Sequence, residues 1–123
     1  MDAHDELLRA AVDISRAASG LAAQRFLEGV AVSRKPDGTE VTPADIEVEE
    51  LIRSLIAARF PGDGVAGEEL EDTPGTTGRR WVIDPIDGTS AFAHRIPAFS
   101  VLLAAEDTRG SAVSVISYPM SRD

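Results

Sequence analysis

The chain has 123 residues, of which 43% are hydrophobic and 27% charged, and its formal net charge is −9. This composition is typical of one soluble globular domain, and the acidic balance argues against nucleic-acid binding, because phosphates attract a basic face. There is no cysteine, which excludes a disulfide framework, a thiolate nucleophile and a zinc–thiolate site.

The first predicted element is a long helix that ends near Gly29. Its apolar residues recur at alternating spacings of four and three, which places them on one face of a helix. They are Leu7, Ala11, Ile14, Ala18 and Leu21. Residues 1–6 are acidic and lack the basic and apolar regions of a signal peptide, and no apolar run reaches membrane-spanning length. We therefore expect a cytoplasmic protein that does not bind membranes.

A loop or hairpin is predicted for residues 33–41, followed by a second helix. Thr42 is a good N-cap, Pro43 suits the first helical position, and Asp45 stands three residues after the cap. The sequence Phe-Pro-Gly at residues 60–62 ends this helix.

After residue 62 the pattern of apolar residues changes from that of helices to that of short strands. Residues 65–67 and 80–83 are predicted strands, separated by a polar, flexible loop at 70–79. Residues 98–105 are mostly apolar, which predicts a strand buried on both faces. A turn at 107–110 and a last strand at 111–117 follow. This order predicts the α+β class, with two N-terminal helices packed on a largely antiparallel sheet.

The most informative stretch is residues 81–89. An apolar strand delivers Asp84, and Asp87 follows across Pro85. Two carboxylates at a strand end can converge on a hard cation such as magnesium. Gly88 and Thr89 then open a short helix, where free N–H groups attract an anion. The stretch predicts adjoining cation and phosphate sites, although Asp, Pro and Gly are also common in simple turns.

Two further acidic elements could face the same site. Glu68 and Glu69 follow Gly67 at the end of a short strand, so one carboxylate could point to the cations. Adjacent acids are more often only solvated. Asp45 could contribute as well, but its position after Thr42 also fits helix capping, and the two roles are compatible.

Together these elements resemble the inositol monophosphatase family. Its strand followed by Asp-Pro-Ile/Leu-Asp-Gly-Thr matches residues 81–89 without a gap, and its Gly-Glu-Glu element matches residues 67–69. Its Lys-x-Asp loop and Thr-x-Ala-Asp helix start match Lys35, Asp37, Thr42 and Asp45. The match to residues 97–104 is looser, but the resemblance covers nearly the whole chain.

The resemblance implies roles for individual residues. The metal ligands would be Glu68, Asp84, Asp87 and the carbonyl of Ile86, with two or three Mg²⁺ ions. Asp87, Gly88 and Thr89 would bind the substrate phosphate. The catalytic set would be Asp45, Thr89 and Glu68, with Asp45 and Thr89 orienting the attacking water, and Lys35 would lie in a mobile loop nearby.

The resemblance also implies an incomplete chain. Members are roughly twice as long, and their second half supplies another Asp ligand and most of the substrate pocket. Residues 1–123 would then be the N-terminal metal-binding domain of a protein that is a homodimer when full length. Arg95 and Ser114 stand where relatives often have Gly, which could alter the loop after the phosphate site and the packing of a strand.

The implied activity is magnesium-dependent hydrolysis of a small phosphate monoester by metal-activated water. Residues 33–45 and 80–83 look most like histidinol-phosphatases, with inositol monophosphate as the second substrate, then sugar bisphosphates and phosphoadenosine phosphate. One alternative is an inactive fragment that only binds metal. Another is an aspartyl-nucleophile phosphatase of the haloacid dehalogenase type, which places its two Asp residues two apart rather than three.

Overall fold

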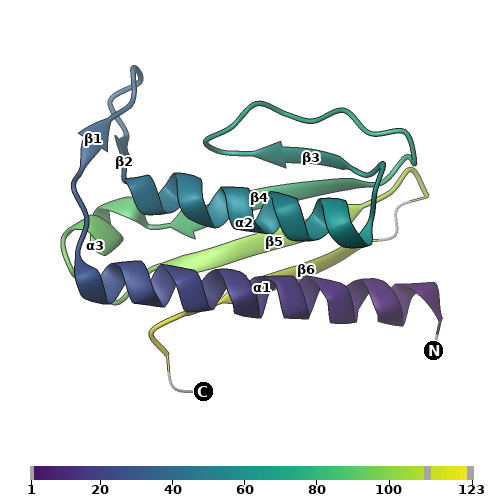
Figure 1. Ribbon diagram of the computed structural model, residues 1–123, viewed down its shortest axis with the longest axis horizontal. Helices are drawn as coiled ribbons and strands as arrows, with labels where there is room; N and C mark the ends of the chain where they lie inside the picture. Colours follow the sequence, from purple (N-terminus) through teal and green to yellow (C-terminus); the bar gives the residue numbers. More distant parts are fainter. Residues whose placement is uncertain (1, 110–111, 122–123) are drawn as a thin grey trace.

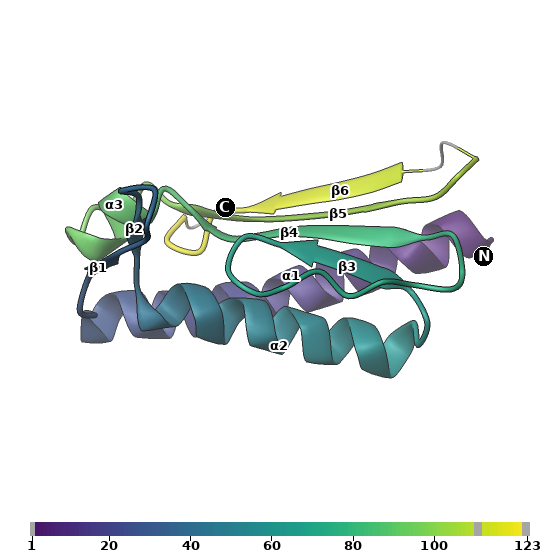
Figure 2. The same ribbon diagram turned by 90° about the horizontal axis from the view of Figure 1, so that it is seen from above.

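The computed structural model describes residues 2–109 and 112–121. Two helices cover one face of a four-stranded sheet, and both lie on the same side of that sheet (Figure 1 and Figure 2). The elements in chain order are α1 (Ala3–Glu28), β1 (Ser33–Arg34), β2 (Glu40–Val41), α2 (Pro43–Arg59), β3 (Gly64–Gly67), β4 (Arg80–Asp87), α3 (Thr89–Ala93), β5 (Ser100–Glu106) and β6 (Ala112–Ser117). The predicted α+β class and the packing of two N-terminal helices on the sheet are confirmed.

Helix α1 begins and ends at residues that suit those positions. The Asp2 side chain accepts a hydrogen bond from the backbone N–H of Asp5 at 2.9 Å, which satisfies one free donor of the first turn. Gly29 follows the last turn with a φ of 81°, a value that glycine adopts without strain. Four residues of the predicted apolar face, Leu7, Ala11, Ile14 and Ala18, are buried, and Leu21 is half-buried; the alanines let the helix lie close to the sheet.

Along the chain, a hairpin and the second helix come between α1 and the strands of the sheet. Ser33 pairs with Val41 and Arg34 with Glu40, so the predicted hairpin forms from two-residue strands. Helix α2 starts at Pro43 as predicted, and the Thr42 N–H donates to the Asp45 carboxylate at 2.8 Å. The hairpin and α3 both lie at the end of the molecule where α2 begins (Figure 1).

The sheet has the strand order β3-β4-β5-β6. Strand β3 runs parallel to β4, whereas the β4–β5 and β5–β6 pairs are antiparallel, so the sheet is largely but not wholly antiparallel. Strand β4 is longer than predicted and continues to Asp87, with a register shift between Asp84 and Asp87. Pro85 lies inside that shift, where a residue without an N–H is tolerated.

The prediction that residues 98–105 are buried on both faces is wrong. Strand β5 starts at Ser100, and along it fully buried residues alternate with half-buried ones. The helices cover the side that carries Val101, Leu103 and Ala105. The opposite face of the sheet remains partly open at Leu102 and Ala104. The last predicted strand is confirmed as β6, from Ala112 on. Its first residue, and the last residue of the turn predicted at 107–110, lie outside the described residues.

An aromatic cluster fixes the short helix α3 beside the end of the sheet (Figure 2). The Phe26 ring lies 5.1 Å from that of Phe99 and 5.7 Å from that of Phe92, and Phe92 meets Phe99 edge-on at 4.9 Å. Such contacts add to the free energy gained by burying the rings. Since Phe92 belongs to α3, this cluster holds in place the segment that follows Asp87.

The loop predicted as flexible at 70–79 is tied to β3. Val65 and Thr73 exchange two backbone hydrogen bonds, with N···O distances of 2.9 and 2.8 Å. The buried Asp63 carboxylate accepts from Thr77, Arg79 and the Trp81 indole. None of the helices in the described part of the chain is both long and apolar enough to cross a bilayer.

Candidate active site

The predicted acidic residues come together at one end of the sheet. In the parallel pair β3–β4, Gly67 lies opposite Ile83, so the next residues of the two segments, Glu68 and Asp84, lie near each other. A cavity of about 490 Å³ opens there. Six of the predicted site residues line it, namely Glu68, Asp84, Ile86, Asp87, Gly88 and Thr89. Lys35 and Asp37 of the hairpin line the same cavity.

Asp84 is the electrostatic centre of this cavity. Its pKa is raised to about 6, first by burial and then by the negative charges of Asp87, Glu68 and Asp45, in that order. Asp84 and Asp87 line the same cavity, with the register shift of β4 between them. The site therefore gathers more negative charge than the protein alone neutralises.

A hard divalent cation fits this donor set chemically. Carboxylates forced together bind a proton more tightly, and a cation that replaces the proton relieves the same repulsion. Within residues 2–109 and 112–121, no three Asp, Glu or His side chains are already arranged so that they could hold a metal ion together. The predicted residues thus share a cavity, but their side chains do not form a finished coordination site.

Asp45 lies beneath the cavity and combines the two roles considered for it. It is buried, with 1% of its surface exposed. One carboxylate oxygen accepts from the N–H and the hydroxyl of Thr42, at 2.8 and 2.7 Å, and so caps α2. The other accepts from the Thr89 hydroxyl at 2.9 Å. The start of α2 is thereby joined to the start of α3.

Thr89 and Gly88 form the turn from β4 into α3. Gly88 has a φ of 89°, which explains why glycine stands there. The Thr89 hydroxyl also lies 3.1 Å from the carbonyl oxygen of Ile86. Since a hydroxyl carries one proton, it donates to either Asp45 or Ile86 at a given moment. The Ile86 carbonyl and the Thr89 oxygen therefore border the same small space beside Asp84 and Asp87.

The β1–β2 hairpin reaches the site through an ion pair. The Lys35 ammonium lies 2.6 Å from a Glu69 carboxylate oxygen, and that hydrogen bond raises the pKa of Lys35. The Asp37 carboxylate accepts from the N–H and the hydroxyl of Thr39 and shapes the hairpin turn. The hairpin is thus attached to the acidic segment next to Glu68.

Arg95 occupies the end of α3 in an unusual backbone conformation. Its φ is 66°, the only positive value at a non-glycine residue in the described part of the chain. Its guanidinium donates to the carbonyl of Leu27 at 3.4 Å, near the end of α1. The departure from glycine at this position therefore ties the loop after the phosphate-site turn to α1.

Sequence reasoning missed Glu49. This residue is fully buried in α2, and its carboxylate accepts from the backbone N–H groups of Glu69 and Leu70. The available signal was its position one helical turn after Asp45, which predicts that both side chains share a face. Glutamate in a helix is usually exposed, so this spacing alone did not indicate burial.

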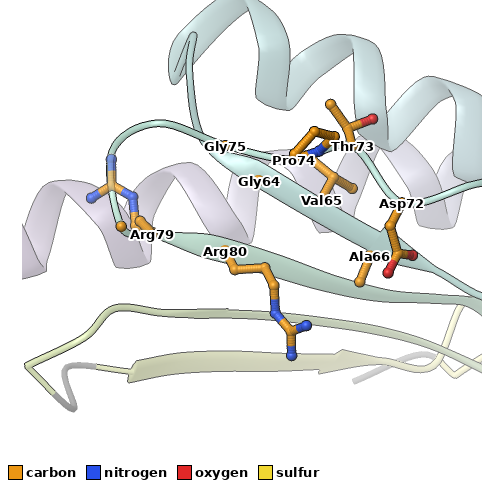
Figure 3. Close-up of a pocket in the computed structure, with 10 residues that line it drawn as sticks. Gly64, Val65, Ala66, Asp72, Thr73, Pro74, Gly75, Arg79 and Arg80 are labelled. Atoms are coloured by element: carbon orange, nitrogen blue, oxygen red, sulfur yellow. The ribbon is translucent and has the colours of Figure 1, made fainter.

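A second crevice lies at the opposite end of β3 from the acidic cavity. It is bounded by β3 and the returning segment, with Thr73 and Pro74 beside Val65 (Figure 3). Its lining contains none of the predicted site residues. The acidic cavity is thus the candidate active site.

Comparisons with known proteins agree with this arrangement. The model of the inositol monophosphatase family matches residues 3–123. A histidinol-phosphatase of Chlorobaculum parvum is 42% identical over 91% of this chain and 44% of its own length. One of Mycobacterium tuberculosis is 39% identical over 94% of this chain and 45% of its own length. An inositol-1-monophosphatase of Rhizobium meliloti is 36% identical over 79% of this chain and 36% of its own length.

The solved structures agree as well. The extragenic suppressor protein SuhB of Bartonella henselae superposes with a TM-score of 0.84 at 30% identity, over 93% of this chain and 45% of that one. The chain thus spans less than half the length of these relatives. The match of the family model over nearly all residues shows that the chain belongs to the inositol monophosphatase family.

Proposed function

We propose that this chain forms the N-terminal part of a magnesium-dependent phosphatase that hydrolyses a small phosphate monoester by direct attack of water. The observation that carries the proposal is the position of Asp84, whose pKa is raised by burial and by Asp87, Glu68 and Asp45. Of these carboxylates Asp45 is buried, Asp84 is half-buried, and Glu68 and Asp87 are exposed. Their mutual repulsion costs stability unless a cation binds to them. Perturbed carboxylates in a cavity are typical of functional sites.

The proposed ligands of the metal are the carboxylates of Glu68, Asp84 and Asp87 and the carbonyl oxygen of Ile86. When bound, two or three magnesium ions would neutralise the phosphate, activate the water and stabilise the leaving alkoxide. The open rim of the cavity at Asp87, Gly88 and Thr89 would receive the phosphate group. Glu68 would be both a ligand and part of the catalytic set.

Asp45 and Thr89 would position the attacking water. The Thr89 hydroxyl donates to Asp45, so its oxygen lone pairs remain free to accept from a water in the cavity. A proton taken from that water can pass through the hydroxyl to the Asp45 carboxylate. Because Thr42 donates to the other oxygen of that carboxylate, Asp45 is held in the orientation that this transfer requires.

The proposed substrate is histidinol phosphate. Two of the most similar curated relatives carry the name histidinol-phosphatase, at 42% and 39% identity. Inositol monophosphate is the second candidate, since named inositol-1-monophosphatases reach 36% and 37%. Because the chain matches less than half of each relative, we also propose that a second half supplies a further Asp ligand, most of the substrate pocket and the contacts of a homodimer.

The test compares this chain alone with the chain fused to the second half of the Chlorobaculum parvum relative. We expect no phosphate release by the chain alone, and magnesium-dependent release from histidinol phosphate by the fusion. Asp84→Asn should abolish release while the circular dichroism spectrum stays unchanged. A folded fusion that keeps its activity with Asp84→Asn, or in a chelator, would contradict the proposal.

The fusion cannot identify the natural substrate, because its second half, with most of the substrate pocket, comes from the relative. The substrate is therefore tested with the complete gene product, assayed on histidinol phosphate and inositol monophosphate. Rapid turnover by the 123-residue chain itself would show that the site is built without a second half. Trapping of a phosphoryl group on Asp84 would favour the aspartyl-nucleophile alternative. A chain that binds magnesium but yields no active fusion would correspond to the metal-binding fragment.

A further inference from the structure

Glu49, on α2, binds the backbone of the acidic segment that follows β3, residues 68–70. Its carboxylate is completely buried. One oxygen accepts from the N–H of Glu69 at 2.9 Å, and the other accepts from the N–H of Leu70 at 3.0 Å. Charge-assisted hydrogen bonds of this kind are among the strongest that a backbone makes. They fix the chain immediately after Glu68.

Arg53, one turn further along α2, completes the attachment. Its guanidinium Nε donates to the Glu49 carboxylate at 3.0 Å, which balances the buried charge. The same guanidinium donates to the Leu70 carbonyl at 3.3 Å and to the Thr73 hydroxyl at 3.1 Å. Helix α2 therefore binds this segment through both its N–H and its C=O groups.

Gly67 fixes the chain on the other side of Glu68. A Cβ atom at Gly67 would overlap the Glu49 carboxylate, so only glycine lets the carboxylate lie directly against the backbone. Glu68 is thus placed between two points that both contact Glu49. Its side chain is exposed toward the cavity, and its backbone has little freedom to turn elsewhere.

We propose that Glu49 is a positioning residue, which acts by holding Glu68 toward Asp84. This inference rests on the proposed function, since it assigns Glu68 to the cation. Glu49 follows Asp45 by one helical turn, and both carboxylates are buried on the sheet side of α2. One face of α2 would therefore position both parts of the site. Asp45 would position Thr89, and Glu49 would position Glu68.

The test measures binding of Mn²⁺, as a probe for Mg²⁺, to the 123-residue chain by electron paramagnetic resonance. Glu49→Gln keeps the volume but removes the charge and one acceptor. We expect it to weaken Mn²⁺ binding roughly 10-fold, as losses of outer-shell partners do. Glu68→Gln should weaken binding at least as much. In the Glu68→Gln background, adding Glu49→Gln should change affinity less than twofold, because its effect passes through Glu68.

Two controls separate positioning from charge and from stability. Glu50→Gln removes an exposed charge from the neighbouring position of α2 and should leave Mn²⁺ binding unchanged. Asp63→Asn removes a buried carboxylate that is also paired with an arginine, at the opposite end of β3 from Glu68. It should lower the unfolding temperature without changing Mn²⁺ affinity.

The outcomes are distinct. If Glu68→Gln weakens binding but Glu49→Gln does not, the inference is wrong and the proposed site stands. If Glu49→Gln weakens binding equally in both backgrounds, it acts through charge alone and the inference is also wrong. If the unchanged chain binds no Mn²⁺, or Glu68→Gln has no effect, the proposed role of Glu68 fails and the inference with it. Should Glu49→Gln not fold, Glu49→Asp replaces it, because its shorter carboxylate keeps the charge but cannot reach both N–H groups.

Discussion

The hydroxyl of Thr89 donates a hydrogen bond to the buried carboxylate of Asp45 at 2.9 Å, across 44 residues of sequence. This bond joins the N-terminus of α2 to the turn that leaves β4. Thr89→Val keeps the shape of the side chain but removes the donor, which should lower the free energy of unfolding by about 1 to 3 kcal/mol. Thr89→Ser keeps the hydroxyl and should cost clearly less. Urea unfolding at neutral pH measures both.

The same pair of variants separates structure from catalysis. In an active fusion or complete enzyme, Thr89→Val should remove most of the phosphate release, and Thr89→Ser should retain a substantial part of it. Equal stability of the two variants in urea would mean that the bond to Asp45 contributes little to the fold. Equal activity would mean that Thr89 does not position the water.

Asp84 should make the metal-free chain less stable as the pH rises. Its folded-state pKa is raised to about 6 from an ordinary 3.8, so the folded state keeps the proton longer than the unfolded state. Stability from this group is therefore complete below about pH 4 and is lost as the pH rises through 6. Asp84→Asn should be more stable than the unchanged chain by roughly 1 to 2 kcal/mol at pH 7.5, after allowance for solvent screening.

Chemical unfolding at several pH values in a chelator measures this effect. The advantage of Asp84→Asn should shrink as the pH falls from 7.5 toward 4. Glu50→Gln, an exposed change on α2, should show no comparable dependence. An advantage that stays constant across this range would mean that the charge of Asp84 is not the cause.

Magnesium should stabilise the unchanged chain, because a ligand that binds only the folded state shifts the unfolding equilibrium. For a magnesium concentration tenfold above the dissociation constant, the gain is on the order of 1 kcal/mol. Thermal unfolding in magnesium chloride, compared with a chelator, measures it. Sodium chloride of equal ionic strength is the control for screening, and Asp84→Asn should lose most of the magnesium effect. An equal rise with sodium chloride would rule out a specific site.

The sequence predicted those parts of the site that depend on local order. Asp84 and Asp87 stand at the end of an apolar strand with a proline between them, and Thr42 and Asp45 start a helix, so each pair is positioned by its immediate neighbours. Glu49 could not be predicted in this way. Its burial depends on the end of β3, some twenty residues away in sequence, and a glutamate within a helix carries no local sign of that contact.

The open sheet face shows a second limit. The apolar run at 98–105 predicted burial on both sides, yet the two helices cover only one of them. A run of apolar residues indicates that a strand can be buried on both faces, but it does not say whether this part of the chain supplies both layers. The loop at 70–79 was likewise predicted flexible, because its polar composition does not reveal its backbone bonds to Val65.

The stereochemistry at phosphorus distinguishes the two phosphatase mechanisms. Direct attack of water is a single displacement, so an active fusion or complete enzyme should invert the configuration of an isotopically labelled chiral phosphate ester. A route through an aspartyl phosphate has two displacements and retains it. Retention would overturn the proposed roles of Asp45 and Thr89, since neither residue would then orient the first nucleophile.

The open face of the sheet should make the isolated chain associate. On that face Ile116 lies opposite Leu102 in the strand register, and the exposed fractions of Ile116 and Val82 are 58% and 39%. In the described part of the chain β6 has a strand on one side only, so its other edge is available to a second molecule. Sedimentation velocity over a range of concentrations should show assembly beyond the monomer.

A single charge on the edge strand of this surface should reduce the association. Ile116→Lys introduces that charge without disturbing the helix-covered core, so the circular dichroism spectrum should stay the same. Leu27→Lys is the matched control, because Leu27 is similarly exposed, at 64%, but lies at the end of α1. If both variants reduce association to the same extent, general solubility is the cause. If the unchanged chain is monomeric at every concentration, the open face does not bind a second copy.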